Sequence, residues 1–179
     1  GLTQSATKAN ELWALAADKG DANARFNLGK CYRDGIGDLA IDFNRCVELY
    51  EQSAKQGDVD AQASLGKMYR LGSQDGPPMT IPVDPQLSFR WCLAAAKQEH
   101  VTSKRIQHKI NQCMGIIGNA YFTGTGVEQN IEAAFEWRMK AAEKGRAISQ
   151  YNVGFSYEHG RGCEIDLVQA IHWYQKSAA

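Results

Sequence analysis

The feature that most constrains the fold of this chain is an internal repeat. A short block with glycine at its second position and tyrosine at its fifth occurs four times, at Leu28–Tyr32, Leu65–Tyr69, Ile117–Tyr121 and Val153–Tyr157. Four copies exclude coincidence. Repeats on this scale are typical of solenoids, in which each unit leaves an apolar stripe uncovered and neighbouring units stack to form one core.

A second block alternates with the first and is rich in alanine, as in Ala141-Ala142-Glu143-Lys144-Gly145. Each copy has a large apolar anchor residue, and the successive anchors are separated by 37, 42, 46 and 36 residues: Leu12, Leu49, Trp91, Trp137 and Trp173. The basic unit is therefore 36 or 37 residues long. The longer steps must contain insertions.

Seven residues before each anchor stands a side chain that accepts hydrogen bonds from the free N–H groups at the start of a helix. These residues are Ser5, Asp42, Asp84, Asn130 and Asp166. Pro85 follows Asp84 directly, where a first helical turn tolerates its missing N–H. We therefore predict that each second block is a helix that begins at its cap residue.

Glycine-x-glycine turns lie between the two blocks at Gly35–Gly37, Gly124–Gly126 and Gly160–Gly162. Glycine adopts positive φ easily and ends helices tightly, so each unit should be a helix, a glycine turn and a second helix. The predicted fold is all-α: a right-handed α-solenoid of stacked helix-turn-helix repeats, or α/α superhelix. It is a single domain over 1–179, divided into a second helix over 1–20 and repeats over 21–57, 58–99, 100–145 and 146–179.

Two repeats depart from the basic unit. The 58–99 repeat has a proline-rich loop over 73–82 in place of the glycine turn, and its three prolines exclude a helix there. The 100–145 repeat has extra residues over 100–109, which should extend the next helix at its start by about three turns. The first residue falls on a turn glycine in this register, and we expect the chain to be a piece of a longer solenoid.

Composition narrows the possible partners. The chain has 20 basic and 20 acidic side chains and a formal net charge of +0, so it has no overall field for nucleic acid or anionic membranes. No apolar run approaches the length that spans a bilayer. The five cysteines cannot all pair and no N-glycosylation sequon occurs, which favours reduced thiols and a cytoplasmic location.

These blocks resemble the Sel-one-like repeat family, whose units combine a Leu-Gly-x-x-Tyr helix, a Gly-x-Gly-Val turn, an Asp cap and a Trp-Tyr-x-Lys-Ala-Ala helix. The stretches Gly126–Asn130 and Trp137–Gly145 match nearly throughout. Tetratricopeptide repeats share one element, but their shorter step and different turn argue against them. The resemblance implies a non-enzymatic scaffold or adaptor, of the kind used in signalling, cell-wall synthesis control and protein quality control.

In stacked helical hairpins the first helices line the concave side. Positions three before, one after and four after the repeat glycine share one face of such a helix. This face changes along the chain from basic to aromatic, and we predict that it binds an acidic protein segment with apolar anchors. The predicted partner-binding residues are Phe26, Lys30, Arg33, Lys67, Arg70, Asn119, Phe122, Tyr151, Phe155 and Glu158.

No motif in the chain predicts catalysis, a cofactor or a metal. His159 and Cys163 are separated by a glycine turn, and no Cys/His cluster offers the three protein ligands that zinc normally needs. We therefore predict that the chain is not an enzyme, with no catalytic, cofactor-binding or metal residues.

Three alternatives stay open. The chain could be a self-assembling structural module, with a weak homodimer through the last helix and its Ile171, Trp173 and Tyr174. A basic inner surface could bind RNA, although Glu158 and the balanced charge argue against it. Secreted, enzyme-like members of the resembling family have paired cysteines, where this chain has alanines, as at Ala54 and Ala142.

Overall fold

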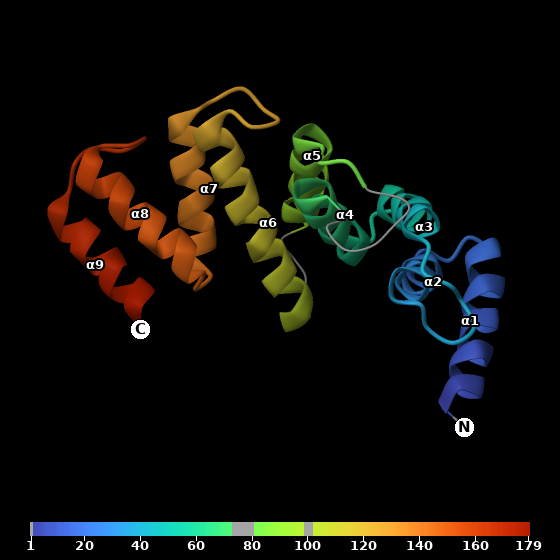
Figure 1. The fold of residues 1–179 in the computed structure, drawn as a ribbon. Coiled ribbons are helices and arrows are strands. Elements are labelled where there is room, and N and C mark those ends of the chain that lie inside the picture. Colours follow the sequence, from blue (N-terminus) through green and yellow to red (C-terminus); the bar gives the residue numbers. More distant parts are fainter. Residues whose placement is uncertain (1, 73–80, 99–101) are drawn as a thin grey trace. The chain divides into compact units, whose positions relative to one another are not determined.

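The structure is a computed structural model that describes residues 2–72, 81–98 and 102–179. These residues form helices and connecting turns, with no strand among them (Figure 1). The helices are α1 (Leu2–Asp18), α2 (Ala22–Asp34), α3 (Phe43–Lys55), α4 (Val59–Leu71), α5 (Pro85–Ala96), α6 (Lys104–Thr123), α7 (Ile131–Glu143), α8 (Ala147–His159) and α9 (Leu167–Ala178). The prediction of an all-α repeat fold is confirmed.

The chain divides into two compact units, Gly1–Val83 and Asp84–Ala179. In the first unit α1 packs on α2, α2 on α3 and α3 on α4. In the second unit each helix from α5 to α9 likewise packs on the next. Sequential helices are therefore neighbours in both units, as expected for stacked hairpins.

The predicted caps start four of the five second helices. The side chains of Asp42, Asp84 and Asn130 accept from the backbone N–H three residues later, at 2.8 to 2.9 Å, and Asp166 accepts from two N–H groups at 3.0 Å. Pro85 occupies the first turn of α5, as predicted. The cap residues therefore predicted the starts of these four helices correctly.

The prediction for Ser5 is wrong, because α1 begins at Leu2 and Ser5 lies inside it. Two caps went unpredicted, on first helices. Asp21 accepts from the N–H of Ala24 at 2.6 Å, and Asp58 accepts from that of Ala61 at 2.7 Å. Each follows a glycine that ends the preceding turn, and this Gly-Asp pair is the sequence signal that marks them.

The core of the first unit forms where α1, α2 and α3 meet. Ala17, Ala24, Leu28 and Leu49 are buried together, and Trp13 and Tyr32 cover them. Small alanines let the helices approach closely, and the large residues fill the remaining space. Leu28 thus packs as predicted from its recurrence.

The second unit repeats this plan between α7, α8 and α9. Ala142, Val153 and Trp173 form its buried cluster, with Phe135 and Tyr157 packed against it. The rings of Phe135 and Tyr157 meet edge to face with centroids 5.3 Å apart. The tyrosine that ends each first block therefore contributes to packing here, as the repeat predicted.

The second glycine of the turn joins one hairpin to the hairpin before it. Gly126 has φ +78° and lies against the backbone of Pro85 at the start of α5. Gly162 has φ +77° and lies against the carbonyl of Ile131 at the start of α7. Any side chain at these places would meet backbone that cannot move aside, so the stacking of hairpins requires glycine.

The insertion over 100–109 does lengthen α6, which has 20 residues where α2, α4 and α8 have 13. Seven extra residues make about two turns, fewer than the three predicted. Of the proline-rich loop over 73–82, residues 73–80 lie outside the described residues.

Candidate functional site

We call the positions three before, one after and four after each repeat glycine the first-helix face. On α2 this face begins with Phe26, which is 5% exposed and stacks on Tyr50 of α3 with centroids 4.9 Å apart. Lys30 lies above the Phe26 ring, its Nζ 6.0 Å from the centroid. Phe26 therefore supplies packing beneath the surface, and Lys30 is the group that meets solvent.

Arg33 is already partnered within the first unit. Its Nε and Nη2 donate to the two carboxylate oxygens of Asp34 at 2.7 and 2.6 Å, and its Nη1 donates to the hydroxyl of Tyr50 at 3.3 Å. The Arg33 guanidinium in turn lowers the pKa of the Asp34 carboxyl. The positive charge predicted at this position is thus largely neutralised by its neighbour.

Lys67 and Arg70 of α4 are both exposed and make no ion pair with other described residues. Ala63, which precedes them on the same face, is buried. Together with Lys30, the two side chains therefore carry the available positive charge of the first-helix face in the first unit.

In the second unit the corresponding positions on α6 include Asn119, which is exposed, and Phe122, which is half-buried. Arg138 of α7 joins them: its guanidinium lies 4.1 Å from the centroid of the Phe122 ring, and its Nη2 donates to Asn119 Oδ1 at 3.1 Å. Arg138 is only 6% exposed, and burial lowers its pKa. Two predicted residues thus meet around a cation that was not predicted.

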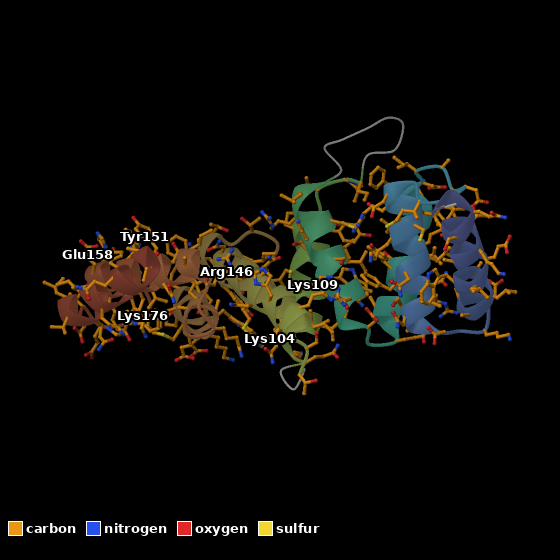
Figure 2. All side chains as sticks on the ribbon, turned by 90° about the horizontal axis from the view of Figure 1, so that it is seen from below. Lys104, Lys109, Arg146, Tyr151, Glu158 and Lys176 are labelled. Carbon is orange, nitrogen blue, oxygen red and sulfur yellow. The ribbon has the colours of Figure 1, made fainter. Side chains whose placement is uncertain are left out.

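On α8 the face consists of Tyr151, Phe155 and Glu158. Tyr151 is 54% exposed, with its ring tilted against that of Tyr174 at 5.3 Å between centroids. Figure 2 shows Tyr151 and Glu158 along the same helix, with Arg146 at its start. The Tyr174 hydroxyl donates to Glu158 at 2.6 Å, and burial together with this bond raises the pKa of Tyr174 to about 12.

The same contact recurs in three hairpins. The residue after the anchor of the second helix covers the repeat glycine: a Cβ on Gly29 would lie 2.7 Å from Tyr50, one on Gly118 2.8 Å from Arg138, and one on Gly154 2.8 Å from Tyr174. Each covering side chain then reaches the residue four after that glycine, namely Arg33, Phe122 or Glu158. The geometry is shared and the chemistry differs.

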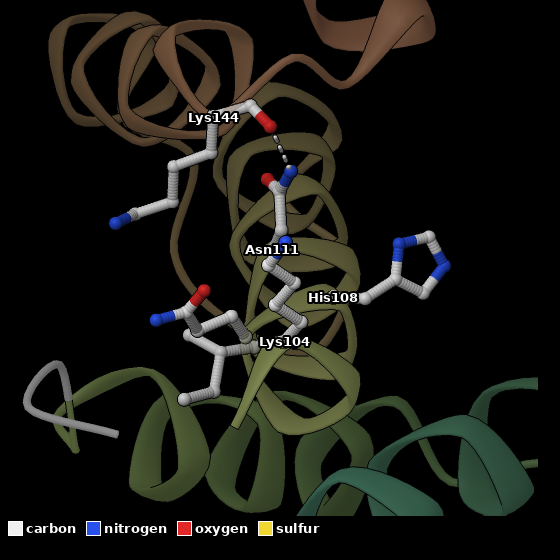
Figure 3. A pocket seen from close by; sticks show the side chains of 6 residues that line it. Lys104, His108, Asn111 and Lys144 are labelled. Carbon is white, nitrogen blue, oxygen red and sulfur yellow. Dashed lines mark hydrogen bonds between the residues drawn. The ribbon is translucent and has the colours of Figure 1, made fainter. Parts of the chain in front are cut away.

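A hollow of about 380 Å³ lies beside the lengthened start of α6 (Figure 3). Its lining includes Lys104, His108 and Lys144, and Asn111, whose Nδ2 donates to the carbonyl of Lys144 at 3.1 Å. The hollow is open and carries cationic side chains. It belongs to the insertion and is separate from the first-helix face in sequence.

Two further features of the described residues bear on metal binding and thiol reactivity. No group of three or more His, Cys, Asp or Glu side chains there could hold a metal ion. The His159 ring stacks on Phe155 with centroids 4.2 Å apart. Cys46 is fully buried, which raises the pKa of its thiol to about 12 and disfavours the reactive thiolate.

Comparison with known families decides the identity of the fold. The model of the Sel1 repeat matches residues 1–21, 22–58, 59–100, 113–145 and 147–179. The chain belongs to the Sel1 repeat family. A crystal structure of a Sel1 repeat protein from Oxalobacter formigenes superposes with a TM-score of 0.75 at 26% identity, covering 94% of this chain and 63% of that one.

Two curated Sel1 relatives indicate the settings in which such repeats occur. Chitin synthase regulator SKT5 of Saccharomyces cerevisiae is 30% identical over 99% of this chain and 23% of its own length. The ERAD-associated E3 ubiquitin-protein ligase component HRD3A of Arabidopsis thaliana is 37% identical over 35% of this chain and 9% of its own. The chain thus spans less than a quarter of either relative.

The family motif reveals a site residue that sequence reasoning missed, Arg138. Sel1 repeats favour Trp-Tyr at the anchor, and this chain has Trp173-Tyr174 there but Trp137-Arg138 in the preceding repeat. The replacement of a tyrosine by arginine at a packing position was the available signal. The partner-binding role of the ten predicted residues stays a prediction.

Proposed function

We propose that this Sel1 chain is a protein-interaction adaptor that binds a partner segment along its first-helix face. The observation that carries the proposal is the shared contact of the three hairpins. The packing of the second helix on the repeat glycine is the same in all three, while the residue that the covering side chain reaches changes from Arg33 to Phe122 to Glu158. A surface whose support is fixed and whose side chains vary suits recognition of an irregular protein segment.

The available groups define the partner's chemistry. Lys67 and Arg70 favour acidic residues, while Tyr151 offers an exposed aromatic ring of the kind that dominates binding energy in protein interfaces. The relatives support the proposal, because one is a regulator of chitin synthase and the other a component of a ubiquitin ligase. The absence of catalysis and the cytoplasmic location both remain predictions. None of the described helices has the length and apolar character needed to cross a bilayer.

The test is capture of a discrete partner from native extract by the chain and by a charge-reversed variant. Lys67→Glu with Arg70→Glu should lose the partner, because both side chains are exposed and without ion pairs in the described residues. The matched control is Lys8→Glu with Lys19→Glu, which changes the net charge equally at exposed positions away from the face. Equal capture by both variants would place binding elsewhere, with the hollow beside α6 the next surface to alter.

A second candidate function is self-assembly, favoured by apolar side chains on α9. Leu167, Val168 and Ile171 are 60%, 76% and 58% exposed, whereas Trp173 is buried in the core. A weak homodimer would therefore use Leu167 and Val168 beside Ile171, whereas Trp173, which the sequence also suggested, is buried. Sedimentation over a range of concentrations tests this, and a strict monomer at high concentration excludes it.

A further inference from the structure

Arg138 is a buried cation without a counter-charge in the part of the chain that the structure describes. It is 6% exposed, and desolvation by burial is the cause of its lowered pKa, with no carboxylate contributing. Taking a guanidinium out of water costs free energy unless an anion or several acceptors replace the lost hydration. The described residues supply Arg138 with one acceptor, Asn119 Oδ1, and one aromatic face, Phe122.

The position of the guanidinium is nevertheless well defined. Phe122 covers one face of it at 4.1 Å, and Asn119 holds Nη2 at 3.1 Å. The Cγ of Arg138 rests on Gly118, where an added Cβ would lie 2.8 Å away. The group is therefore pre-positioned by α6 and α7, which lie side by side (Figure 1).

Part of the hydrogen-bonding capacity of Arg138 is unused. Its Nε is buried without an acceptor, and Nη1 has no hydrogen-bond partner in the described residues either. Nη1, unlike Nε, keeps some contact with solvent, and this is the side from which an anion would approach. The exposed amide of Asn119 lies beside this approach and has its own N–H groups to donate.

We infer that Arg138, Asn119 and Phe122 form a receptor for a single carboxylate of the bound partner. The inference rests on the proposed function and names the chemistry of one contact in it. One oxygen of the carboxylate accepts from Arg138 Nη1, and the amide of Asn119 donates to the other. A monoanion matches the one unpaired cation, whereas a phosphate dianion would need a second one.

The equivalent places in the other two hairpins that share this contact have no such capacity. Tyr50 is bonded by Arg33, which is itself paired with Asp34. Tyr174 donates to Glu158, and the carboxylate of Glu158 would repel an acidic partner. The receptor is therefore local to the α6–α7 hairpin and fixes where an acidic residue of the partner lies.

The experiment is an NMR titration of the isolated chain with N-acetylglutamate N-methylamide at constant ionic strength. The cross-peaks of the Arg138 Nε–H and the Asn119 side-chain amide should shift and saturate. N-acetylglutamine N-methylamide, which is neutral and otherwise alike, should shift them little. The variant Arg138→Tyr restores the residue that covers glycine in two other hairpins, so it should fold normally and weaken the response by about tenfold or more.

Three results would overturn the inference. They are equal shifts with the glutamine probe, an unchanged response of Asn119 in the Arg138→Tyr variant, and tighter binding of N-acetylphosphoserine N-methylamide than of the glutamate probe. Because the probe is a small molecule, failure here leaves partner capture intact. Conversely, saturation by the glutamate probe supports the receptor even if no partner is captured from extract.

Discussion

In the α2–α3 hairpin the side chain that covers the repeat glycine is Tyr50, whereas in the α6–α7 hairpin it is Arg138. In the first, an aromatic ring from the second helix meets the cation Arg33 on the first helix. In the other, the cation comes from the second helix and meets the aromatic ring of Phe122. The same backbone contact thus accepts either order of cation and ring.

The difference lies in what satisfies the charge. Arg33 has Asp34 beside it and reaches the surface, so its charge is paired and partly hydrated. Arg138 has no carboxylate partner among the described residues and is almost fully buried. The cation of the first hairpin is therefore paired within that hairpin, whereas the cation of the second has no anionic partner among the described residues. The comparison separates residues that hold the repeat together from residues that are available to a partner.

The largest effect should come from removing the ring that completes the first hairpin. Tyr50→Ala deletes a fully buried aromatic side chain and leaves a cavity between Phe26 and Gly29. We expect the free energy of unfolding to fall by about 3–5 kcal/mol, measured by urea denaturation followed by circular dichroism. Tyr151→Ala, at an exposed position, should cost less than about 0.5 kcal/mol, and equal losses would contradict the buried role of Tyr50.

Adding a methyl group at the shared contact should have the next largest effect. In Gly118→Ala the new Cβ lies 2.8 Å from Arg138 Cγ and 3.2 Å from its backbone N, which cannot move aside. Overpacking should lower the free energy of unfolding by about 1–3 kcal/mol, whereas replacing glycine by alanine in a helix raises it by under about 1 kcal/mol. The net loss should be about 1–2 kcal/mol. On the same helix, Gly115→Ala meets only the flexible end of Arg146 and should be neutral or stabilising.

Replacing the unpaired cation should raise stability. Arg138→Tyr removes the buried charge and installs the residue that covers glycine in the other two hairpins. We expect the free energy of unfolding to rise by about 1 kcal/mol, since a buried guanidinium without an anion is costly. Arg138→Lys keeps a cation and should give no gain. A loss of stability in Arg138→Tyr would mean that the Phe122 contact compensates the buried charge.

The smallest effect concerns the pair that neutralises the first hairpin. Arg33 lowers the pKa of Asp34 below its ordinary value of 3.8, so the pair stabilises the fold above that value. This contribution is lost as the pH falls through the lowered pKa of the folded state. Asp34→Asn should therefore cost a few tenths of a kcal/mol at neutral pH and nothing in strong acid, because the pair is exposed.

A double-mutant cycle checks that assignment. If the stability losses of Asp34→Asn and Arg33→Gln simply add at neutral pH, the two side chains do not interact, and the comparison between the hairpins loses its electrostatic basis.

Much of the fold could be predicted from the sequence because its signals are local. A cap such as Asp42 bonds the N–H three residues later, and a turn glycine such as Gly35 ends its own helix at positive φ. The recurrence of Leu28 and its equivalents marked core positions without knowledge of their neighbours. The predicted start of α1 was wrong because a residue of the cap type, such as Ser5, can also lie inside a helix.

The candidate site was less predictable because its properties depend on the facing helix. Helical spacing groups Phe26 with Lys30 and Arg33, yet it does not say that Phe26 turns onto Tyr50, 24 residues later in the chain. It groups Asn119 with Phe122 and gives no hint that Arg138 completes the set. Burial, and contacts such as that of Arg138 with Asn119, depend on the facing helix, and a one-dimensional pattern does not contain them.

The sequence alone thus determined the repeat, its helices, its glycine turns and its membership of the Sel1 family, since each follows from residues within one turn or one repeat. Only the tertiary structure decided which charged groups are buried, and so which cation lacks a carboxylate partner among the described residues. The physical reason is that side chains such as Arg138 lose their hydration where two helices meet, whereas a counter-charge such as Asp34 can come from the same helix. For this chain the meeting of α6 and α7 leaves Arg138 as the group whose charge a partner can complete.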